Sequence, residues 1–443
     1  MKEALETWLA RQSLHAREEM FKSISRIDMV KRRPGFGHEI RAARGSIIAS
    51  PVLADWHPEP DYFFHWFRDS AIVIDALRLL YEAGSAGAEA TVHLHDFVRF
   101  SMALGQIEGR RLVEDSSWRG QVVPEFVQYL REGSELEGVR GENVVAETRV
   151  NPDGTLDITS WTRPQHDGAA LRALALLRWS RITTLAPAVQ SDLAALLNTD
   201  LAFVAKNWRV PAFDMWEEER NQHYHTLCVS AAAMDGGARW LEGQSGDTAL
   251  VQRYRSEARE IRLQLDAFWL PHAGFYASRL SAPDVACDKA LDISIVFAAI
   301  HAWDGSTGPH TVADPRIHAT LEKLMALFSE LYPINRGRMA GPAMGRYRGD
   351  RYFSGGAYYF STFGAAELCF RAAAVCLDAA TWRARGDAFL DTIRDFTPAS
   401  GDLSEQFDQA DGRQTSARHL AWSYAAFISC IAARTAALSG STR

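Results

Sequence analysis

SGGAYYFSTFGAAELCFRAAAVCL, residues 354–377, is the stretch most informative about the architecture of this protein. It is rich in glycine, alanine and serine, and its aromatic residues fall on most sides of a helix. A helix that is apolar all round packs in a protein interior, because a surface helix keeps one polar face. We therefore predict an interior helix over 354–377, enclosed by other helices.

Helical periodicity continues on both sides of this stretch and dominates the chain. Apolar residues recur at steps of three and four, the spacing that places them on one face of a helix. Strand-like patterns are limited to short pieces such as 44–50. The predicted helices span residues 1–25, 69–84, 88–106, 167–182, 187–208, 221–242, 246–268, 288–304, 314–332, 354–377, 378–397 and 415–438. The fold class is therefore all-α.

Twelve helices in one chain fit a double ring, with six helices inside and six outside. The loops rich in aromatic and charged residues precede even-numbered helices, so their helix N-termini open on the same end of such a ring. The partial positive charge of a helix N-terminus suits carboxylates placed there. The stretch 108–160 has the weakest periodicity and many glycines. We expect it to wrap as loops near the mouth of the ring.

Length and composition favour one folded unit. The chain has 443 residues and is 47% hydrophobic, which allows a large buried core. Length alone would suggest two or three domains, but a double ring of twelve helices uses the whole chain. No linker rich in proline, serine or threonine and no low-complexity tract interrupts the sequence. We predict a single domain over residues 1–443.

Charge and cysteine usage limit the partners and the compartment. The net charge of −7 leaves no basic surplus for a nucleic acid. No run of roughly 18 apolar residues predicts a membrane span, and the N-terminus lacks the features of a signal peptide. Except for Cys287, the cysteines lie in apolar helical stretches, which indicates reduced thiols in a cytoplasmic protein. The five cysteines are Cys228, Cys287, Cys369, Cys376 and Cys430. The oligomeric state is left open.

Two short acidic-aromatic segments, FDMWEEE at 213–219 and LSEQFD at 403–408, point to chemistry on sugars. Cleavage of a glycosidic bond needs an acid for the leaving oxygen and a base or nucleophile on the opposite face. Glu217 and Glu405 are the candidates. The indole of Trp216 can desolvate the carboxyl group of Glu217 and raise its pKa.

Each carboxylate also has a structural interpretation. Glu217 and its two acidic neighbours would be stabilised as a solvated helix N-terminus by the helix dipole. Glu405, taken alone, is an ordinary loop glutamate. Glu405 is a catalytic candidate only because the two segments occur together.

Arginine–aromatic motifs occur in three other predicted loops. Arg68 and Asp69 follow the aromatic run 62–67 and can form paired hydrogen bonds to sugar hydroxyls. The alternative is a helix-capping aspartate with a surface arginine. Arg163 lies near Trp161 in a segment whose proline, aspartate and glycine are also good turn residues. Arg346 and Tyr347 form a further pair.

No metal or cofactor is expected. The groups His93/His95/Asp96 and His223/His225 resemble ligand spacings, but residues two apart on a helix diverge by about 200°. A phosphate-binding glycine loop and a Gly-x-Ser-x-Gly elbow are absent from the sequence.

These motifs together resemble the glucoamylases of glycoside hydrolase family 15, most closely the catalytic domain of the fungal enzymes. The resemblance runs through most of the chain in the expected order. The matching segments are Gly45–Pro51, Asp61–Ser70, Trp161 with Arg163–Gln165 and Asp167–Gly168, Asp214–Glu218, Gly345–Tyr347, and the run from Leu403–Gln406 through Ser416–Arg418 to Trp422–Ala425.

The resemblance implies an (α/α)6 barrel and hydrolysis from the non-reducing end of α-glucans, with inversion to β-glucose. Glu217 would be the general acid and Glu405 the general base, roughly 6.5–9.5 Å apart. Tyr62 would position the base, and Glu218 would bind sugar. The other residues implied in the pocket are Trp66, Arg68, Asp69, Trp161, Arg163, Trp216, Arg346, Tyr347, Tyr358, Ser416 and Trp422.

The sequence departs from the fungal pattern in several places. Gly356-Ala357-Tyr358 stands where the fungal enzymes carry Asn-Pro-Trp, and a tyrosine offers less stacking area than a tryptophan. His166, Glu219 and the run 223–225 also differ from the usual residues. No starch-binding module is recognised.

We therefore expect an exo-acting, inverting α-glucosidase that hydrolyses malto- or isomalto-oligosaccharides. Whether it prefers the α-1,4 or the α-1,6 linkage is left open. The alternatives are a phosphorylase of the same barrel architecture and a non-catalytic sugar-binding protein. A phosphorylase would replace the base by a phosphate pocket, and a binding protein would have lost one of the two carboxylates.

Overall fold

The structure is a computed structural model that describes residues 3–182, 185–244, 246–280 and 289–440. The starts predicted for the helices at residues 1 and 288, as well as Cys287, lie outside the described residues. Every predicted helix has a counterpart, with ends shifted by a few residues. The helices are α1 (Leu5–Phe21), α2 (Phe67–Glu82), α3 (Glu89–Leu104), α6 (Asp167–Trp179), α7 (Pro187–Asn207), α8 (Tyr224–Gly243), α9 (Thr248–Leu265), α10 (Ser294–His301), α11 (Pro315–Leu331), α12 (Tyr359–Val375), α13 (Ala379–Phe396) and α14 (Ala421–Ser439).

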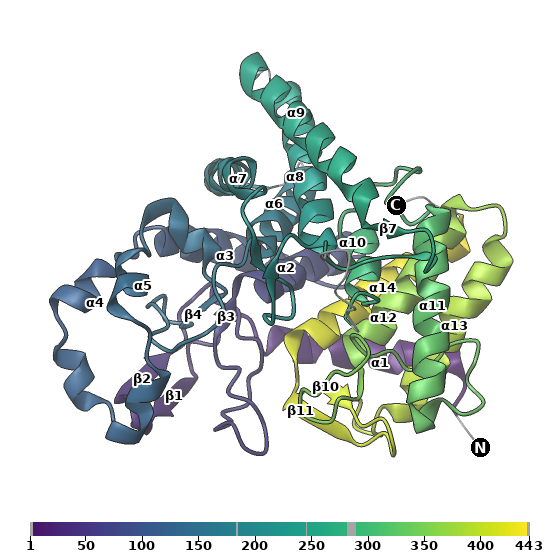
Figure 1. Cartoon of the computed structure of the whole chain (residues 1–443), viewed down its shortest axis with the longest axis horizontal. Coiled ribbons are helices and arrows are strands. Elements are labelled where there is room, and N and C mark those ends of the chain that lie inside the picture. Colours follow the sequence, from purple (N-terminus) through teal and green to yellow (C-terminus); the bar gives the residue numbers. More distant parts are fainter. Residues whose placement is uncertain (1–2, 183–184, 245, 281–288, 441–443) are drawn as a thin grey trace.

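The described helices form two concentric layers, as an (α/α)6 barrel requires. In the inner layer, α2 packs on α6, α6 on α8, α8 on α10, α10 on α12, α12 on α14, and α14 again on α2. This sequence of contacts closes a ring. The outer helices are α1, α3, α7, α9, α11 and α13, each of which packs against at least one inner helix. Figure 1 labels the helices of both layers.

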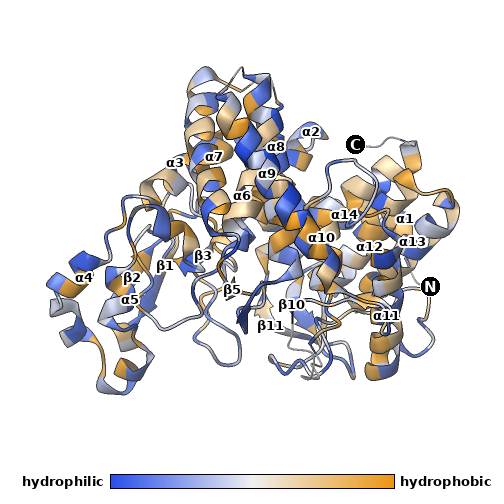
Figure 2. Cartoon of the chain, turned by 45° about the horizontal axis from the view of Figure 1, so that its top comes forward, coloured by the Kyte–Doolittle hydropathy of each residue, from blue (hydrophilic) through white to orange (hydrophobic). Residues whose placement is uncertain are grey.

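Burial follows the two layers. The interior helix predicted over 354–377 is α12, which is buried along nearly its whole length. The outer helix α9 buries one face only and carries many hydrophilic residues, whereas α10 is almost wholly apolar (Figure 2). Where α6 meets the start of α2, the backbones approach closely at Gly168, since an added Cβ there would lie 2.7 Å from the Cβ of Phe67. The main core cluster runs from Trp8 to Ala437. The single domain over residues 1–443 stays a prediction.

Short strands occur at the ends of the barrel helices. A strand-like piece was expected at 44–50, but there only Ile47 makes an isolated bridge, to Ile24. The pairs are all antiparallel: β1 (Val30–Arg33) with β2 (His38–Arg41), β3 (His65–Trp66) with β4 (Arg149–Val150), β5 (Ala212–Phe213) with β6 (Arg220–Asn221), and β7 (Trp269–Leu270) with β8 (Phe275–Tyr276). A three-stranded sheet contains β11 (Gln414–Arg418), β10 (Ser404–Phe407) and β9 (Ala357–Tyr358), in that order.

The sheet corrects one predicted boundary. A helix was predicted to begin at residue 415, but residues 414–418 pair with β10, and α14 begins only at Ala421. By length and composition α14 could cross a membrane, and 67% of its apolar window is buried within the protein. This helix packs against α1, α2 and α12, so its apolar character is that of a core helix.

Residues 108–160, predicted as loops, contain two short helices, α4 (Arg110–Glu114) and α5 (Gly133–Glu137), and several 3₁₀ turns. This segment lies at one side of the molecule, next to β1 and β2 (Figure 1). A small apolar cluster of its own, which includes Leu136 and Val139, packs against Phe100 of α3. The segment therefore has a core where loops were expected.

Candidate active site

A cavity of about 230 Å³ lies at the end of the barrel where the inner helices begin. Its walls come from the loops before α2, α6, α8, α12 and α14, as the loop pattern in the sequence predicts. The lining residues are Ala49, Tyr62, Trp66, Arg68, Asp69, Trp161, Met215, Trp216, Glu217, Glu218, Arg346, Tyr352, Tyr358, Phe360, Glu405, Leu420 and Trp422. Both candidate carboxylates are therefore in one cavity.

Glu217 lies in the tight turn between β5 and β6, with φ at 66°. The alternative interpretation, a solvated helix N-terminus, does not hold at this point, because α8 begins only at Tyr224. The side chain of Asp214 stabilises this turn, and no helix dipole takes part. Its Oδ1 accepts hydrogen bonds from the backbone N–H groups of Glu218, at 2.7 Å, and Glu219, at 3.0 Å.

Three N–H donors hold the carboxylate of Glu217. Its Oε1 accepts from Nε1 of Trp66 at 3.0 Å and from Nη2 of Arg68 at 2.8 Å, and its Oε2 accepts from Nε1 of Trp161. The indole expected to act on this group was that of Trp216. The donors are two other indoles, because β3 and the loop before α6 bring them to the turn.

Glu405 lies on β10, a strand, where a loop was expected. Only 8% of the residue is exposed, and this burial raises the pKa of its carboxyl group to about 7. The hydroxyl of Ser416 donates a hydrogen bond to Oε2 and acts in the opposite direction. Ser416 comes from the paired strand β11, which explains why the two residues meet across ten intervening positions in the sequence.

Tyr62 faces the base candidate, as the resemblance implies. Its hydroxyl lies 3.4 Å from each carboxylate oxygen of Glu405 and 2.6 Å from the hydroxyl of Tyr352. Burial, reinforced by the charge of Glu405, keeps the pKa of the Tyr62 hydroxyl well above its usual value. Tyr352 was missed in the sequence, because it stands in a polar loop outside the quoted motifs.

Arg68 and Asp69 lie in the first turn of α2 and belong to a cluster of buried charged side chains. Nη2 of Arg68 lies 3.1 Å from Oδ2 of Asp69 and also bonds Glu217. Neither carboxylate oxygen of Asp167, at the start of α6, has a hydrogen-bond partner among the described residues. Burial raises the pKa of Asp167 to about 7, although the charge of Arg68 opposes the shift. Arg68 and Asp69 are both buried and the N-cap of α2 is Trp66, so the surface arginine and the capping aspartate considered as alternatives are excluded.

Glu218 stands at the rim of the cavity among three donors. Its Oε1 pairs with Arg346 at 2.9 Å. Its Oε2 accepts from the Tyr347 hydroxyl at 2.5 Å and from Nζ of Lys289 at 2.6 Å. Lys289 also bonds Oδ2 of Asp214 at 2.6 Å, which ties the turn to the segment before α10. No motif surrounds Lys289 in the sequence, and it was missed.

An aromatic stack forms the floor of the cavity. The ring of Trp422 lies 4.4 Å from that of Phe360 at an angle of 7°, and the ring of Trp216 stacks on both. Nε1 of Trp216 donates to both carboxylate oxygens of Asp292, at 2.9 and 3.1 Å. Burial raises the pKa of Asp292 to about 6, although the charge of Lys289 opposes the shift. Trp216 therefore builds the floor of the pocket.

Comparison with known proteins identifies the family. The model of glycosyl hydrolases family 15 matches residues 36–106, 140–385 and 378–432. The chain belongs to glycosyl hydrolase family 15. It is therefore a glycoside hydrolase of the glucoamylase type, and its double ring is the (α/α)6 barrel of that family.

Individual relatives agree with this assignment. The chain is similar to a probable glucoamylase of Schizosaccharomyces pombe, with 29% identity over 88% of this chain and 85% of the relative. It is 27% identical to glucoamylase-1 of Schizophyllum commune over 90% of this chain and 70% of the relative. The solved structure of the Saccharomycopsis fibuligera glucoamylase has a similar fold, with a TM-score of 0.79 and 21% identity over 98% of this chain and 96% of that chain.

Three residues that the family resemblance placed in the pocket do not line the cavity. Ser416 and Tyr347 act through Glu405 and Glu218, as described above. Arg163 is engaged elsewhere, since its guanidinium pairs with Glu147 at 2.6 Å and Asp157 at 3.0 Å. These bonds fix the loop that carries Trp161, which gives Arg163 a structural role here, and its role as a sugar ligand stays a prediction.

In both histidine groups considered as metal ligands, one histidine contacts another side chain of the protein. Nε2 of His95 lies 3.0 Å from Asp192, and Nε2 of His225 lies 3.2 Å from Nδ1 of His301. A different trio has ligand atoms within 4.8 Å of one another, namely His15, Glu19 and Asp402. His15 pairs with Asp402 at 2.9 Å, and Glu19 pairs with Lys22.

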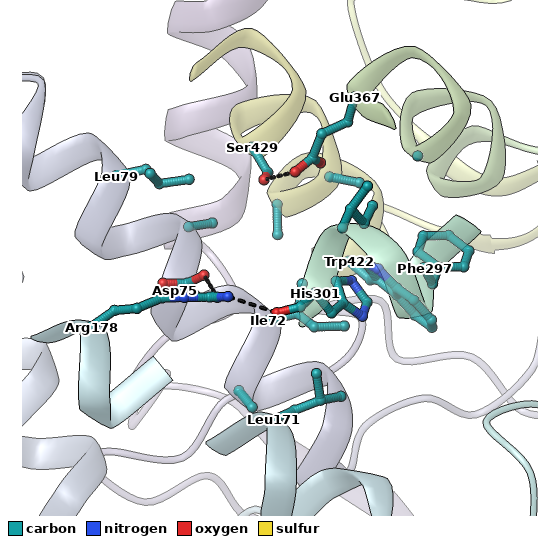
Figure 3. A pocket seen from close by; sticks show the side chains of 16 residues that line it. Ile72, Asp75, Leu79, Leu171, Arg178, Phe297, His301, Glu367, Trp422 and Ser429 are labelled. Carbon is teal, nitrogen blue, oxygen red and sulfur yellow. Dashed lines mark hydrogen bonds and ion pairs between the residues drawn. The ribbon is translucent and has the colours of Figure 1, made fainter. Parts of the chain in front are cut away.

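A second, smaller cavity of about 40 Å³ lies among the inner helices and has Trp422 in its lining (Figure 3). Its polar side chains are paired with one another. Nη2 of Arg178 bonds the backbone oxygen of His301 at 2.6 Å, its Nη1 pairs with Asp75, and the Ser429 hydroxyl donates to Glu367 at 2.8 Å. Trp422 lines both cavities and separates them.

Proposed function

We propose that this family 15 enzyme is an exo-acting, inverting α-glucosidase that removes terminal glucose from short malto- or isomalto-oligosaccharides. The observation that carries the proposal is the placement of Glu217 and Glu405 in the walls of one cavity with an aromatic floor. A closed floor admits the end of a sugar chain and stops it there, which favours attack on the terminal residue.

Each of the two carboxyl groups carries out one proton transfer in the reaction. Glu217 donates a proton to the glycosidic oxygen as the bond from that oxygen to C1 of the terminal glucose breaks. Glu405 removes a proton from a water molecule whose oxygen bonds to C1 on the opposite face, so the α-linkage yields β-glucose. Exchange with solvent then restores both groups. The N–H groups of Trp66, Arg68 and Trp161 fix the direction of the Glu217 carboxyl group throughout.

The polar rim suits recognition of sugar hydroxyls. Arg68, Asp69 and Arg346 are charged, buried and part of the cavity lining. Charge-assisted hydrogen bonds from such groups are stronger than neutral ones and have fixed geometry. Glu218, whose side chain is 32% exposed, is placed to bind the second sugar at the entrance.

The first experiment follows the anomer that is released. Methyl α-maltoside has a fixed anomer at its reducing end, so proton NMR of a fresh reaction reports only the newly freed glucose. We expect the β-anomer first, followed by slow mutarotation. Release of the α-anomer first would contradict inversion. If methyl α-isomaltoside is cleaved faster, the enzyme prefers the α-1,6 linkage.

The same assay separates the other functions considered above. A phosphorylase would release sugar phosphate and depend on added phosphate, whereas hydrolysis proceeds without it. A non-catalytic binding protein would bind the maltoside in calorimetry and release no glucose.

We also propose that the protein acts in the cytoplasm. The support is chemical, because Cys228, Cys369, Cys376 and Cys430 are free thiols and all but Cys376 are buried. Disulfides are rare in a reducing compartment. Cell fractionation with detection of the protein would test this location, and recovery from the medium or a membrane fraction would contradict it.

A further inference from the structure

Trp56 is an exposed aromatic residue next to the active-site cavity. It lies in the loop between Ser50 and Tyr62, and the second of these residues lines the cavity. The indole of Trp56 packs against that of Trp161, with ring centroids 5.8 Å apart and an angle of 38°. Even so, 46% of Trp56 remains exposed to solvent.

Trp161 itself is partly buried and has partners of its own. Its Nε1 donates to Glu217, and the guanidinium carbon of Arg149 lies 3.8 Å from the centroid of its ring. Arg149 is 1% exposed and pairs with Asp157 at 2.9 Å, so it is a fixed cover on that ring. The more exposed aromatic side chain at this wall is therefore that of Trp56.

The backbone of Trp56 is held in an unusual conformation. Its φ of 70° is an outlier for a bulky residue, and such outliers persist where the surrounding structure fixes them, often at ligand-binding positions. Contacts on both sides fix the loop. Nζ of Lys31 bonds the backbone oxygen of Ala54 at 2.7 Å and pairs with Asp55, and Arg418 pairs with Glu59.

We propose that Trp56 forms an outer sugar-binding site, on which a glucose residue further along an α-glucan chain stacks. The inference rests on the proposed function. Trp161 contacts both Glu217 in the cavity and Trp56 outside it, so a chain that leaves the cavity along this wall meets Trp56. A sugar ring has an apolar face of C–H groups, and a rigid exposed indole buries that face at little cost in conformational entropy.

The experiment compares chain lengths in one variant. Trp56→Asn removes the ring, and asparagine tolerates the left-handed backbone better than other residues with a Cβ. The measured quantity is the ratio of kcat/KM for maltoheptaose to kcat/KM for maltose, or for the matching isomalto-oligosaccharides. We expect this ratio to fall by about 3- to 10-fold, the range of a single aromatic contact. Leu53→Ala is the control, because Leu53 is 48% exposed in the same loop. We expect it to leave the ratio unchanged.

An unchanged ratio in Trp56→Asn would overturn the outer site. That includes the case in which both substrates lose activity equally, since Trp56 would then act through Trp161 on catalysis. The proposed function fails separately, because it requires the unmodified enzyme to release glucose from maltose or isomaltose at all.

Discussion

Glu217, Glu218 and Glu219 are consecutive in the sequence, yet the tight turn between β5 and β6 gives each a different environment. Glu217 is held by two indoles and an arginine, and Glu218 lies at the rim of the cavity. Glu219 pairs with Arg279 outside the cavity. The turn, not a helix, separates the three side chains.

The two carboxylates assigned to proton transfer are tested by amide substitution. We expect Glu217→Gln and Glu405→Gln each to lower kcat by about 10²- to 10⁴-fold, the usual contribution of an acid or base, with substrate binding retained in calorimetry. Glu219→Gln is the matched control and should keep kcat within about twofold. A normal rate in either of the first two variants would remove that residue from its role.

The hydroxyl of Ser416 tunes the base. Burial raises the pKa of Glu405 to about 7, and the hydrogen bond from Ser416 lowers it. A general base must be ionised, so activity is lost as the pH falls through this pKa. Ser416→Gly removes the donor, and glycine adopts the native φ of 64° without strain. The pKa should rise further, which moves the acidic limb of kcat/KM to higher pH by about one unit.

The pH profile of Thr415→Ser serves as a control, because Thr415 contacts Ser354 and not Glu405. A Ser416→Gly limb that stays in place or moves to lower pH would show that this hydroxyl does not act on the base.

Lys289 bridges Asp214 and Glu218 and so positions the sugar-binding carboxylate. In Lys289→Met the two carboxylates lose their shared cation, and Glu218 keeps only Arg346 and Tyr347 as partners, so its carboxylate is held less firmly. We expect KM for maltose to rise by roughly 5- to 10-fold, with a smaller change in kcat, since Glu218 is partly exposed and its ion pairs are screened. Lys289→Arg should restore most of the loss. Equal effects on KM and kcat, without rescue by arginine, would indicate a general structural defect instead.

At the scale of single elements, the long helices could be predicted from the sequence and the short strands could not. A helix of sixteen or more residues repeats its apolar spacing several times, as α2 and α12 do. A strand of two residues such as β5 shows no alternation at all. The strand β9 pairs with β10 across a long stretch of sequence, so the hydrogen bonds between them leave no local signal. The errors at Glu217 and Glu405 both come from such strands.

Contact between α2 and α6 depends on Gly168. An added Cβ would lie 2.7 Å from Cβ of Phe67 and 3.2 Å from the backbone nitrogen of Arg68, so one helix must move. We expect Gly168→Ala to lower the free energy of unfolding by about 1–3 kcal/mol, as overpacking does. Gly243→Ala, in the last turn of α8, meets nothing within 4 Å and should be neutral or slightly stabilising. Urea unfolding of both variants measures the difference, and equal stabilities would contradict the close contact.

At the scale of the whole molecule, the double ring places the active site. The six inner helices alternate with outer ones along the chain, so their N-termini gather at one end. This alternation is visible in the sequence, and it is the reason why residues as distant as Trp66, Glu217 and Glu405 could be assigned to one cavity. Residues such as Lys289 and Tyr352 reach the same cavity without a surrounding motif. Only the three-dimensional arrangement identifies them.

Trp422 has a consequence for the barrel as a whole. This side chain lines both the sugar pocket and the small inner cavity of about 40 Å³. A much smaller residue there would join the two spaces into a passage that runs deeper into the ring. Whether this enzyme stops a sugar chain after one residue thus depends on a plug built from a few stacked rings.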